Sequence, residues 1–285
     1  MTNEKETETQ KSMPPHAQLI KMSTAFLKSR VLYTAAKLRL ADQLSDGPKR
    51  AEELAESIGV HAPSLYRLMR ALAHFGVVSM EDGRFSLTEL GEALKKGSPG
   101  EARSTILTVA GKGFGKSFFK LPETLEDGEP GMEKAFDMSW FDYLENQPKM
   151  SSHFNKTMIG FHGAEPPAVA EAYDFSDFDT IVDVGGATGH MLATIFEQYS
   201  NPEGILFELP RVIEEAPPLL RERGVSNRVE CESGNFFEEV PEGGDAYILS
   251  HILHDWRKEQ CLDILENCRE AMHSQSRLLV VEMML

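Results

Sequence analysis

The sequence predicts an α/β fold in which an N-terminal helical module precedes a parallel sheet with helices on both of its faces. Two observations indicate this order. Before residue 111 the pattern is helix, helix and hairpin, which is typical of a winged helix-turn-helix. From Asp179 onward, short β-branched strands alternate with amphipathic helices, as in the βαβ units of a parallel sheet. Ligands of such sheets bind at the carboxyl ends of the strands.

The composition is that of an ordinary globular protein. The 285 residues are 41% hydrophobic and 26% charged, and no apolar run approaches the roughly 18 residues of a membrane span. Residues 1–13 lack the apolar core of a signal peptide, so we expect a disordered tail and a cytoplasmic protein without membrane contact. A net charge of −16 argues against nucleic acid as a partner. The three cysteines, Cys231, Cys261 and Cys268, predict neither a disulfide framework nor a metal site.

Residues 14–110 form the predicted winged-helix module. Its expected elements are an amphipathic helix (Ala17–Leu44), two short helices (Ala51–Gly59 and Pro63–Gly76), a hairpin turning at Glu81–Gly83 (Val77–Leu87) and a last helix (Thr88–Lys96). DNA binding would use Arg67 and Arg70 of the second short helix, but the first carries Glu52, Glu53 and Glu56. We therefore expect a dimerisation domain, and the apolar surface of the first helix predicts a homodimer.

Residues 111–175 are interpreted as a helical linker that contributes to a substrate pocket. The run Gly111–Ser117 resembles a phosphate-binding loop, but alanine stands where its first glycine is needed and no strand precedes it, so we expect an ordinary loop. Residues 135–161 look helical, with a break at Pro148. Phe154 and Met158 share one face of this helix, either as core residues or as the wall of an aromatic pocket.

Residues 176–285 carry the predicted sheet, and its first strand ends in a glycine turn. The five expected strands are Thr180–Val184, Ile205–Glu208, Arg228–Ser233, Ala246–Leu249 and Leu278–Met283, and the intervening helices are Met191–Tyr199, Val212–Arg223 and Lys258–His273. In the turn, Asp183, Gly185 and Gly189 are spaced as Asp-x-Gly-x-x-x-Gly, with Gly186 between them. A dinucleotide fingerprint would need a glycine where valine stands at position 184. The carboxylate of Asp183 would repel a pyrophosphate and attract an ammonium group.

The spacing therefore favours S-adenosylmethionine (AdoMet), which carries an ammonium and no phosphate, over NAD. Glycine turns at this position also form for tight packing alone. A second acid supports the cofactor interpretation, because Glu208 ends the next strand about 20 residues later, where ribose hydroxyls need an acceptor.

Polar side chains follow the fourth strand at the same predicted edge. They are Ser250, His251, His254 and Asp255, and Glu282 approaches from late in the fifth strand. Asp255 is a plausible N-cap for the next helix. A histidine at this edge is often structural, but beside a cofactor site it can take a proton at neutral pH, with a carboxylate to orient it.

Together these features make the chain resemble the O-methyltransferase family that includes plant caffeate, hydroxyindole and bacterial polyketide methyltransferases. The resemblance runs from about Gln18 to the last residue. Beside the winged-helix module, the motifs that carry it are Phe154–Met158, Asp183–Gly189, Phe207–Pro210, Gly234–Phe237, His254–Trp256 and Val280–Glu282.

The resemblance implies a role for each matching residue. The cofactor contacts would come from Asp183, Gly185, Gly186, Gly189, Glu208, Gly234, Asn235, Phe236 and Ser250. Glu208 would hold the ribose, and Asn235 and Phe236 the adenine. His254 would be the general base with Glu282 beside it, while Phe154, Met158 and Asp255 would face the acceptor. The family usually has aspartate at positions 208 and 235, so we expect weaker AdoMet binding here.

The chain also stops earlier than the family pattern, which continues past the fifth strand with a helix and an antiparallel strand pair. We expect a truncated, incomplete or inactive chain on that ground. The function predicted overall is AdoMet-dependent methylation of a hydroxyl on an aromatic or polyketide-like small molecule. The alternatives are a winged-helix regulator that binds AdoMet as an effector and an inactive dimer partner.

Overall fold

The computed structural model describes residues 13–283, apart from the side chain of Ile159, and divides the chain into two compact units. The first unit comprises residues 1–161 and the second comprises residues 162–285. The predicted tail at residues 1–13 lies almost wholly outside the described residues. No helix within residues 13–283 has the length and apolar character that crossing a membrane needs.

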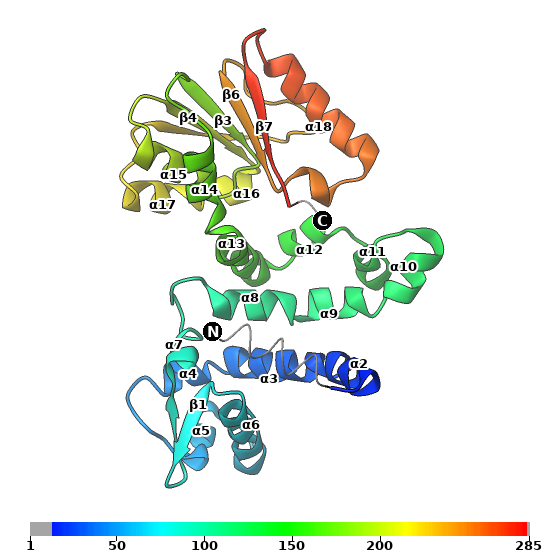
Figure 1. Cartoon of the computed structure of the whole chain (residues 1–285), viewed down its shortest axis with the longest axis vertical. Coiled ribbons are helices and arrows are strands. Elements are labelled where there is room, and N and C mark those ends of the chain that lie inside the picture. Colours follow the sequence, from blue (N-terminus) through cyan, green and yellow to red (C-terminus); the bar gives the residue numbers. More distant parts are fainter. Residues whose placement is uncertain (1–12, 284–285) are drawn as a thin grey trace. The chain divides into compact units, whose positions relative to one another are not determined.

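The first unit is helical with one small hairpin (Figure 1). Its winged-helix part contains α2 (Pro15–Ser23), α3 (Ala25–Lys37), α4 (Leu40–Gln43), α5 (Ala51–Ile58), α6 (Ala62–His74), β1 (Val78–Glu81), β2 (Arg84–Leu87) and α7 (Glu89–Glu92). The remaining helices are α8 (Ala102–Val109), α9 (Lys112–Phe118), α10 (Leu121–Asp127), α11 (Gly131–Phe136), α12 (Trp140–Glu145) and α13 (Pro148–His162), which crosses into the second unit. Leu54, Met69 and Phe85 lie at the centre of the winged-helix core.

The structure corrects four predictions in this unit. The expected long helix at residues 17–44 is three helices, because the chain turns at Thr24 and Arg39 adopts a left-handed conformation with φ of 55°. The predicted loop at residues 111–117 is α9, because Phe114 packs edge-on against Trp140 with 4.8 Å between ring centroids, and this packing overrides the low helix propensity of glycine. The expected helix at residues 88–96 shortens to α7. Residues 135–161 contain the predicted break, because α12 ends at Glu145 and α13 begins at Pro148, but they also contain a second break between α11 and α12 that was not predicted.

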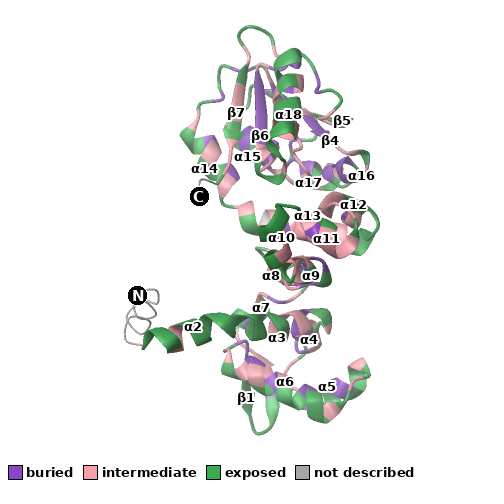
Figure 2. Ribbon diagram, turned by 90° about the vertical axis from the view of Figure 1, so that its right-hand side faces the viewer, coloured by how far each residue is buried: buried purple, intermediate pink, exposed green. Residues whose placement is uncertain are grey.

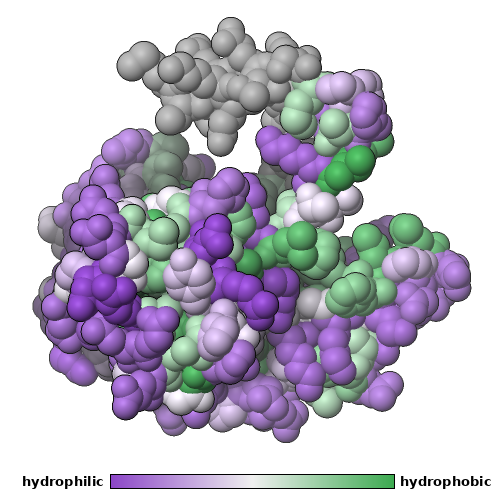
Figure 3. Space-filling view, turned by 90° about the horizontal axis from the view of Figure 1, so that it is seen from below, coloured by the Kyte–Doolittle hydropathy of each residue, from purple (hydrophilic) through white to green (hydrophobic). Residues whose placement is uncertain are grey.

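Much apolar surface of α2 and α3 is exposed in this unit. α2 buries none of its residues, as Figure 2 shows by its exposed colouring. Leu19 and Met22 are three residues apart on α2, Phe26 lies at the start of α3, and the three are 67%, 66% and 60% exposed. Hydrophobic side chains are also visible between hydrophilic ones in the space-filling view of Figure 3. Such a surface is more apolar than a helix facing only water requires.

The second unit is built on five parallel strands in the order β5-β4-β3-β6-β7. The strands are β3 (Thr180–Val184), β4 (Glu203–Glu208), β5 (Val229–Ser233), β6 (Ala246–Ser250) and β7 (Arg277–Val281). The helices are α14 (Glu165–Ala172), α15 (His190–Gln198), α16 (Pro210–Ile213), α17 (Ala216–Glu222), the short 3₁₀ helix η1 (Leu253–Asp255) and α18 (Lys258–Ala271). All five strands were predicted within a few residues. The helix predicted at residues 212–223 is two helices, and Glu282 lies just after β7 instead of within it.

Helices cover both faces of this sheet (Figure 1) because successive strand residues point to opposite sides. Ile181 and Ile248 pack against α15 and α17, whereas Val182 and Leu249 pack against α18. The first four residues of β6 are fully buried, which is visible in Figure 2. The chain order of the strands reverses between β3 and β6, and ligands of open parallel sheets bind at the carboxyl ends beside such a reversal.

Candidate active site

The loop after β3 forms a tight turn at the reversal point. Gly185, Ala187 and Gly189 have φ of 72°, 50° and 81°, and Gly189 directly precedes α15. The amide of Gly185 donates to the carbonyl of Phe207 at 2.8 Å, which ties the turn to β4. The turn therefore has a fixed backbone whose amides line the carboxyl edge of the sheet.

Asp183 lies directly beneath this turn. A Cβ atom at Gly186 would stand 2.4 Å from the Asp183 carboxyl and 2.6 Å from Leu206, so only glycine fits there. Asp183 is 1% exposed, and neither of its carboxyl oxygens has a hydrogen-bond partner among residues 13–283. Burial, with a further contribution from the charge of Glu208, raises the pKa of Asp183 to about 7. The turn therefore has a buried carboxyl group beneath it that could interact with a positively charged or hydrogen-bonding ligand.

This raised pKa predicts a stability that falls as the pH rises. Below pH 7 the folded protein keeps a proton on Asp183 that the unfolded chain, with an ordinary pKa of 3.8, has released. The free energy of unfolding should therefore fall by roughly 1.4 kcal/mol per pH unit between about pH 4.5 and pH 6.5, and level off near pH 8. Urea unfolding of Asp183→Asn measured in parallel should lack this component. Parallel pH profiles for the two proteins would contradict the prediction.

Glu208 ends β4 and fastens the turn from the side. One carboxylate oxygen accepts from the amide of Ala187 at 3.0 Å, and the other accepts from the amide of Leu209 at 2.7 Å. Burial raises the pKa of Glu208, although these two amide hydrogen bonds act in the opposite direction. A carboxylate oxygen can accept two hydrogen bonds, so each retains one acceptor site. Glu208 can therefore organise the loop and still receive two hydroxyl groups.

The residues after β5 form the neighbouring part of this edge. A Cβ atom at Gly234 would stand 2.4 Å from the Phe207 ring, so the chain passes too close for any side chain. Asn235 accepts from the amide of Phe237 at 3.1 Å and donates to Glu238 at 3.2 Å, so its side chain is held locally. Phe236 packs against Phe237 with 4.9 Å between ring centroids.

His254 and Glu282 form a pair beyond the ends of β6 and β7. Nδ1 of His254 lies 2.5 Å from one carboxylate oxygen of Glu282, and the other oxygen accepts from the amide of Leu253 at 2.9 Å. Burial acts to raise the pKa of Glu282, but the hydrogen bond and charge of His254 outweigh it, so the pKa lies below its ordinary value. The ionised carboxylate accepts the Nδ1 proton, which leaves Nε2 as the nitrogen that can take up a proton.

The remaining predicted site residues are Ser250, Asp255, Phe154 and Met158, and they lie in three different elements. Ser250 is the last residue of β6. The prediction that Asp255 caps the following helix is wrong, because Arg257 holds that position and Asp255 belongs to η1, 3.5 Å from Nε2 of His254. Phe154 and Met158 lie on α13 in the first unit, and Phe154 packs against Trp140.

Sequence reasoning missed Glu165. Its carboxylate contacts Nε2 of His251 and lies 3.1 Å from Nδ1 of His162. The ring of His251 is also 5.4 Å from that of His254. Glu165 lies 86 residues before His251, and no local motif marks it, because it is only the first residue of the short helix α14.

A parallel sheet with this turn, a terminal acid on the next strand and a histidine–carboxylate pair beside the reversal point defines an AdoMet-dependent methyltransferase domain. Comparison with known proteins places it more closely. Residues 118–285 match the O-methyltransferase domain family, and residues 20–97 match the O-methyltransferase dimerisation domain. The chain belongs to this family of AdoMet-dependent O-methyltransferases.

Two bacterial O-methyltransferases are among the relatives of this chain. The phenazine O-methyltransferase PhzM of Lysobacter antibioticus is 38% identical over 96% of this chain and 80% of its own length. The O-demethylpuromycin-O-methyltransferase of Streptomyces alboniger is 34% identical, with 94% and 72% covered. The crystal structure of LaPhzM aligns with a TM-score of 0.91 at 38% identity, covering 96% of this chain and 82% of that one.

A further solved structure shows the family with its ligands. NcsB1 from neocarzinostatin biosynthesis, in complex with AdoMet and 2-hydroxy-5-methyl naphthoic acid, aligns with a TM-score of 0.78 at 29% identity over 90% of this chain and 79% of its own. AdoMet is thus the cofactor of the family.

Proposed function

We propose that this protein transfers the methyl group of AdoMet to a hydroxyl group of a small aromatic molecule, with His254 as the general base. The observation that carries the proposal is the placement of two elements at the carboxyl edge of neighbouring strands. The glycine turn follows β3, and the His254–Glu282 pair follows β6 and β7. The substrate class is supported by the relatives, whose names give a phenazine and O-demethylpuromycin as acceptors, and by the naphthoic acid held in NcsB1.

The residues at the turn fit this cofactor. Asp183 supplies a buried carboxyl group with no hydrogen-bond partner in the described part of the chain, which suits a positively charged ligand above the turn. Glu208 has one unused acceptor site on each oxygen, which suits the paired hydroxyls of a ribose. The ring of Phe236 lies beside the turn, since a Cβ atom at Gly185 would stand 3.4 Å from it, and an aromatic side chain there suits the flat adenine ring. When bound, AdoMet supplies an activated methyl group on a positively charged sulfur.

The protein's own contribution is positioning and proton removal. Glu282 holds Nδ1 of His254, so that Nε2 can accept the proton of a bound hydroxyl. Holding two reacting groups in register accounts for the larger part of such rate gains. A general base adds roughly 10²–10⁴-fold. His254 is 46% exposed in its side chain, so an acceptor can reach it from solvent.

Cofactor binding tests the proposal directly. We expect Glu208→Ala to weaken S-adenosylhomocysteine binding by about 1.5–3 kcal/mol, because the carboxylate that would accept hydrogen bonds from the two ribose hydroxyls is lost. Calorimetry with S-adenosylhomocysteine and with NAD provides the measurement. Glu203→Ala, an exposed change at the other end of β4, is the matched control and should bind normally. Tighter binding of NAD than of S-adenosylhomocysteine would refute the cofactor assignment.

We also propose that the protein is a homodimer formed through the dimerisation domain. The exposed apolar face of Leu19, Met22 and Phe26 supports this, because burying it against a second copy removes it from water. Light scattering should give about twice the chain mass of 31.8 kDa. Met22→Glu combined with Phe26→Glu should give the monomer mass, whereas Leu262→Glu on α18, also exposed, should not. A monomer at micromolar concentration in the unmodified protein would contradict the proposal.

A further inference from the structure

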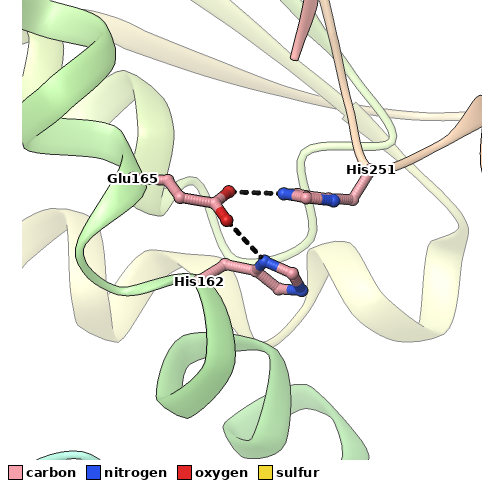
Figure 4. A group of neighbouring side chains, drawn as sticks. All are labelled: His162, Glu165 and His251. Atoms are coloured by element: carbon pink, nitrogen blue, oxygen red, sulfur yellow. Dashed lines mark hydrogen bonds and ion pairs between the residues drawn. The ribbon is translucent and has the colours of Figure 1, made fainter. Parts of the chain in front are cut away.

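Three side chains from separate parts of the second unit converge beside the candidate active site. They are His162 at the end of α13, Glu165 at the start of α14 and His251 just after β6 (Figure 4). One oxygen of Glu165 contacts Nε2 of His251, and the other lies 3.1 Å from Nδ1 of His162. The two imidazole rings lie with their centroids 3.7 Å apart. One nitrogen from each histidine therefore points at the same carboxylate.

His251 is held firmly in this arrangement. Its side chain is only 9% exposed, its backbone has a φ of 55°, and its amide donates to the carbonyl of Val281 at 2.9 Å. Its second ring nitrogen, Nδ1, is buried and has no hydrogen-bond partner in the part of the chain that the structure describes. A carboxylate oxygen of Glu282 lies 3.9 Å from this nitrogen. The imidazole is thus aimed at Glu165 with its other nitrogen left open.

We propose that His162, Glu165 and His251 bind a divalent transition-metal ion, for which Zn²⁺ has the best matching ligand chemistry. Two imidazoles and one carboxylate with an open fourth position form a ligand set that zinc uses in proteins. This role lies outside methyl transfer as proposed above, which uses His254 and Glu282 and needs no metal.

The distances suit such an ion. The ligand atoms of a tetrahedral zinc with bonds of 2.0–2.2 Å stand roughly 3.3–3.6 Å apart. Here the three candidate atoms all lie within 4.8 Å of one another, and one pair is already 3.1 Å apart. Small rotations of the side chains would therefore place all three around one ion. Burial acts to raise the pKa of Glu165, but the hydrogen bonds to both histidines outweigh it, so the pKa lies below its ordinary value and a carboxylate is present.

The surroundings supply the remaining parts of a metal site. A metal bound at Nε2 of His251 places the ring proton on Nδ1, which faces Glu282, and ligating histidines generally donate that proton to a carboxylate. Side chains of His162 and Glu165 are 22% and 32% exposed, so an ion and a fourth ligand such as water can enter from solvent. Metal binding at Nε2 would therefore explain why Nδ1 of His251 is directed toward Glu282.

Zinc titration of the whole, untagged chain tests the proposal without cofactor or acceptor, so its result is independent of methyl transfer. After chelator treatment and dialysis, calorimetry with ZnCl₂ should give one tight site per chain. His162→Gln, Glu165→Gln and His251→Gln should each weaken it by more than about 10-fold, the loss that follows removal of even an outer partner of a metal ligand. Co²⁺ should give the intense visible absorption of a tetrahedral site in the unmodified protein.

Two control variants locate the site. His273→Gln removes an exposed imidazole that lies 3.2 Å from Asp245 and belongs to no three-ligand group among residues 13–283, so zinc binding should persist. His254→Gln removes a member of the neighbouring group His251, His254 and Glu282 and should also leave binding intact. Absence of a stoichiometric zinc site in the unmodified protein overturns the proposal. Loss of zinc binding in His254→Gln with retention in His162→Gln overturns it equally.

Discussion

Replacing His254 by glutamine is expected to lower the turnover of methyl transfer by roughly 10²-fold or more, while the affinity for AdoMet stays nearly unchanged. The glutamine amide can still donate to Glu282, but it cannot accept a proton from the acceptor hydroxyl. The structure motivates this split, because His254 belongs to the edge after β6 and the glycine turn follows β3. Initial rates with a phenolic acceptor and calorimetry with S-adenosylhomocysteine measure the two quantities separately.

The matched control for this change is His273→Gln. His273 is also an exposed histidine paired with a carboxylate, but it lies between α18 and β7, before the strand begins instead of beyond its end. Its substitution should leave both turnover and affinity unchanged. If His254→Gln kept the turnover of the unmodified protein, methyl transfer would depend on positioning alone and His254 would not be the base.

Replacing Gly186 by alanine is expected to abolish cofactor binding and to destabilise the second unit. The new Cβ atom would stand 2.4 Å from the Asp183 carboxyl and 2.6 Å from Leu206, and both side chains are buried. Relief therefore requires the turn itself to move, at a typical overpacking cost of about 1–3 kcal/mol. Calorimetry with S-adenosylhomocysteine and urea unfolding followed through Trp256 measure the two effects.

Gly115→Ala provides the comparison for this substitution. Gly115 lies within α9, and a Cβ atom added to it would meet no other atom within 4 Å. Alanine should be neutral there or stabilise the helix by up to about 1 kcal/mol. Normal cofactor binding by Gly186→Ala would show that the turn is free to shift, and close packing would then not be the reason for glycine at this position.

The local patterns of the sequence were sufficient for the sheet and for the residues at its carboxyl edge. Most strands are short apolar runs, and an alternation of such runs with amphipathic helices is typical of parallel pairing. Asp183, Gly185 and Gly189 lie at the end of β3 and Glu208 lies at the end of β4, the next strand along the chain, so their spacing in the sequence was enough to place them together. The hairpin at residues 78–87 followed from its Asp-Gly turn for the same reason.

Tertiary contacts decided what those patterns could not. Residues 112–118 are helical because Phe114 meets Trp140, a partner 26 residues away that no local rule identifies. Asp183 has a raised pKa because its position in the sheet buries it, and Glu208 accepts from the Ala187 amide of the turn because β3 and β4 lie in register. The His162–Glu165–His251 cluster depends on α14 meeting the end of β6, 86 residues along the chain. Sequence spacing specifies groups that share one element, whereas packing alone determines which distant groups share a site.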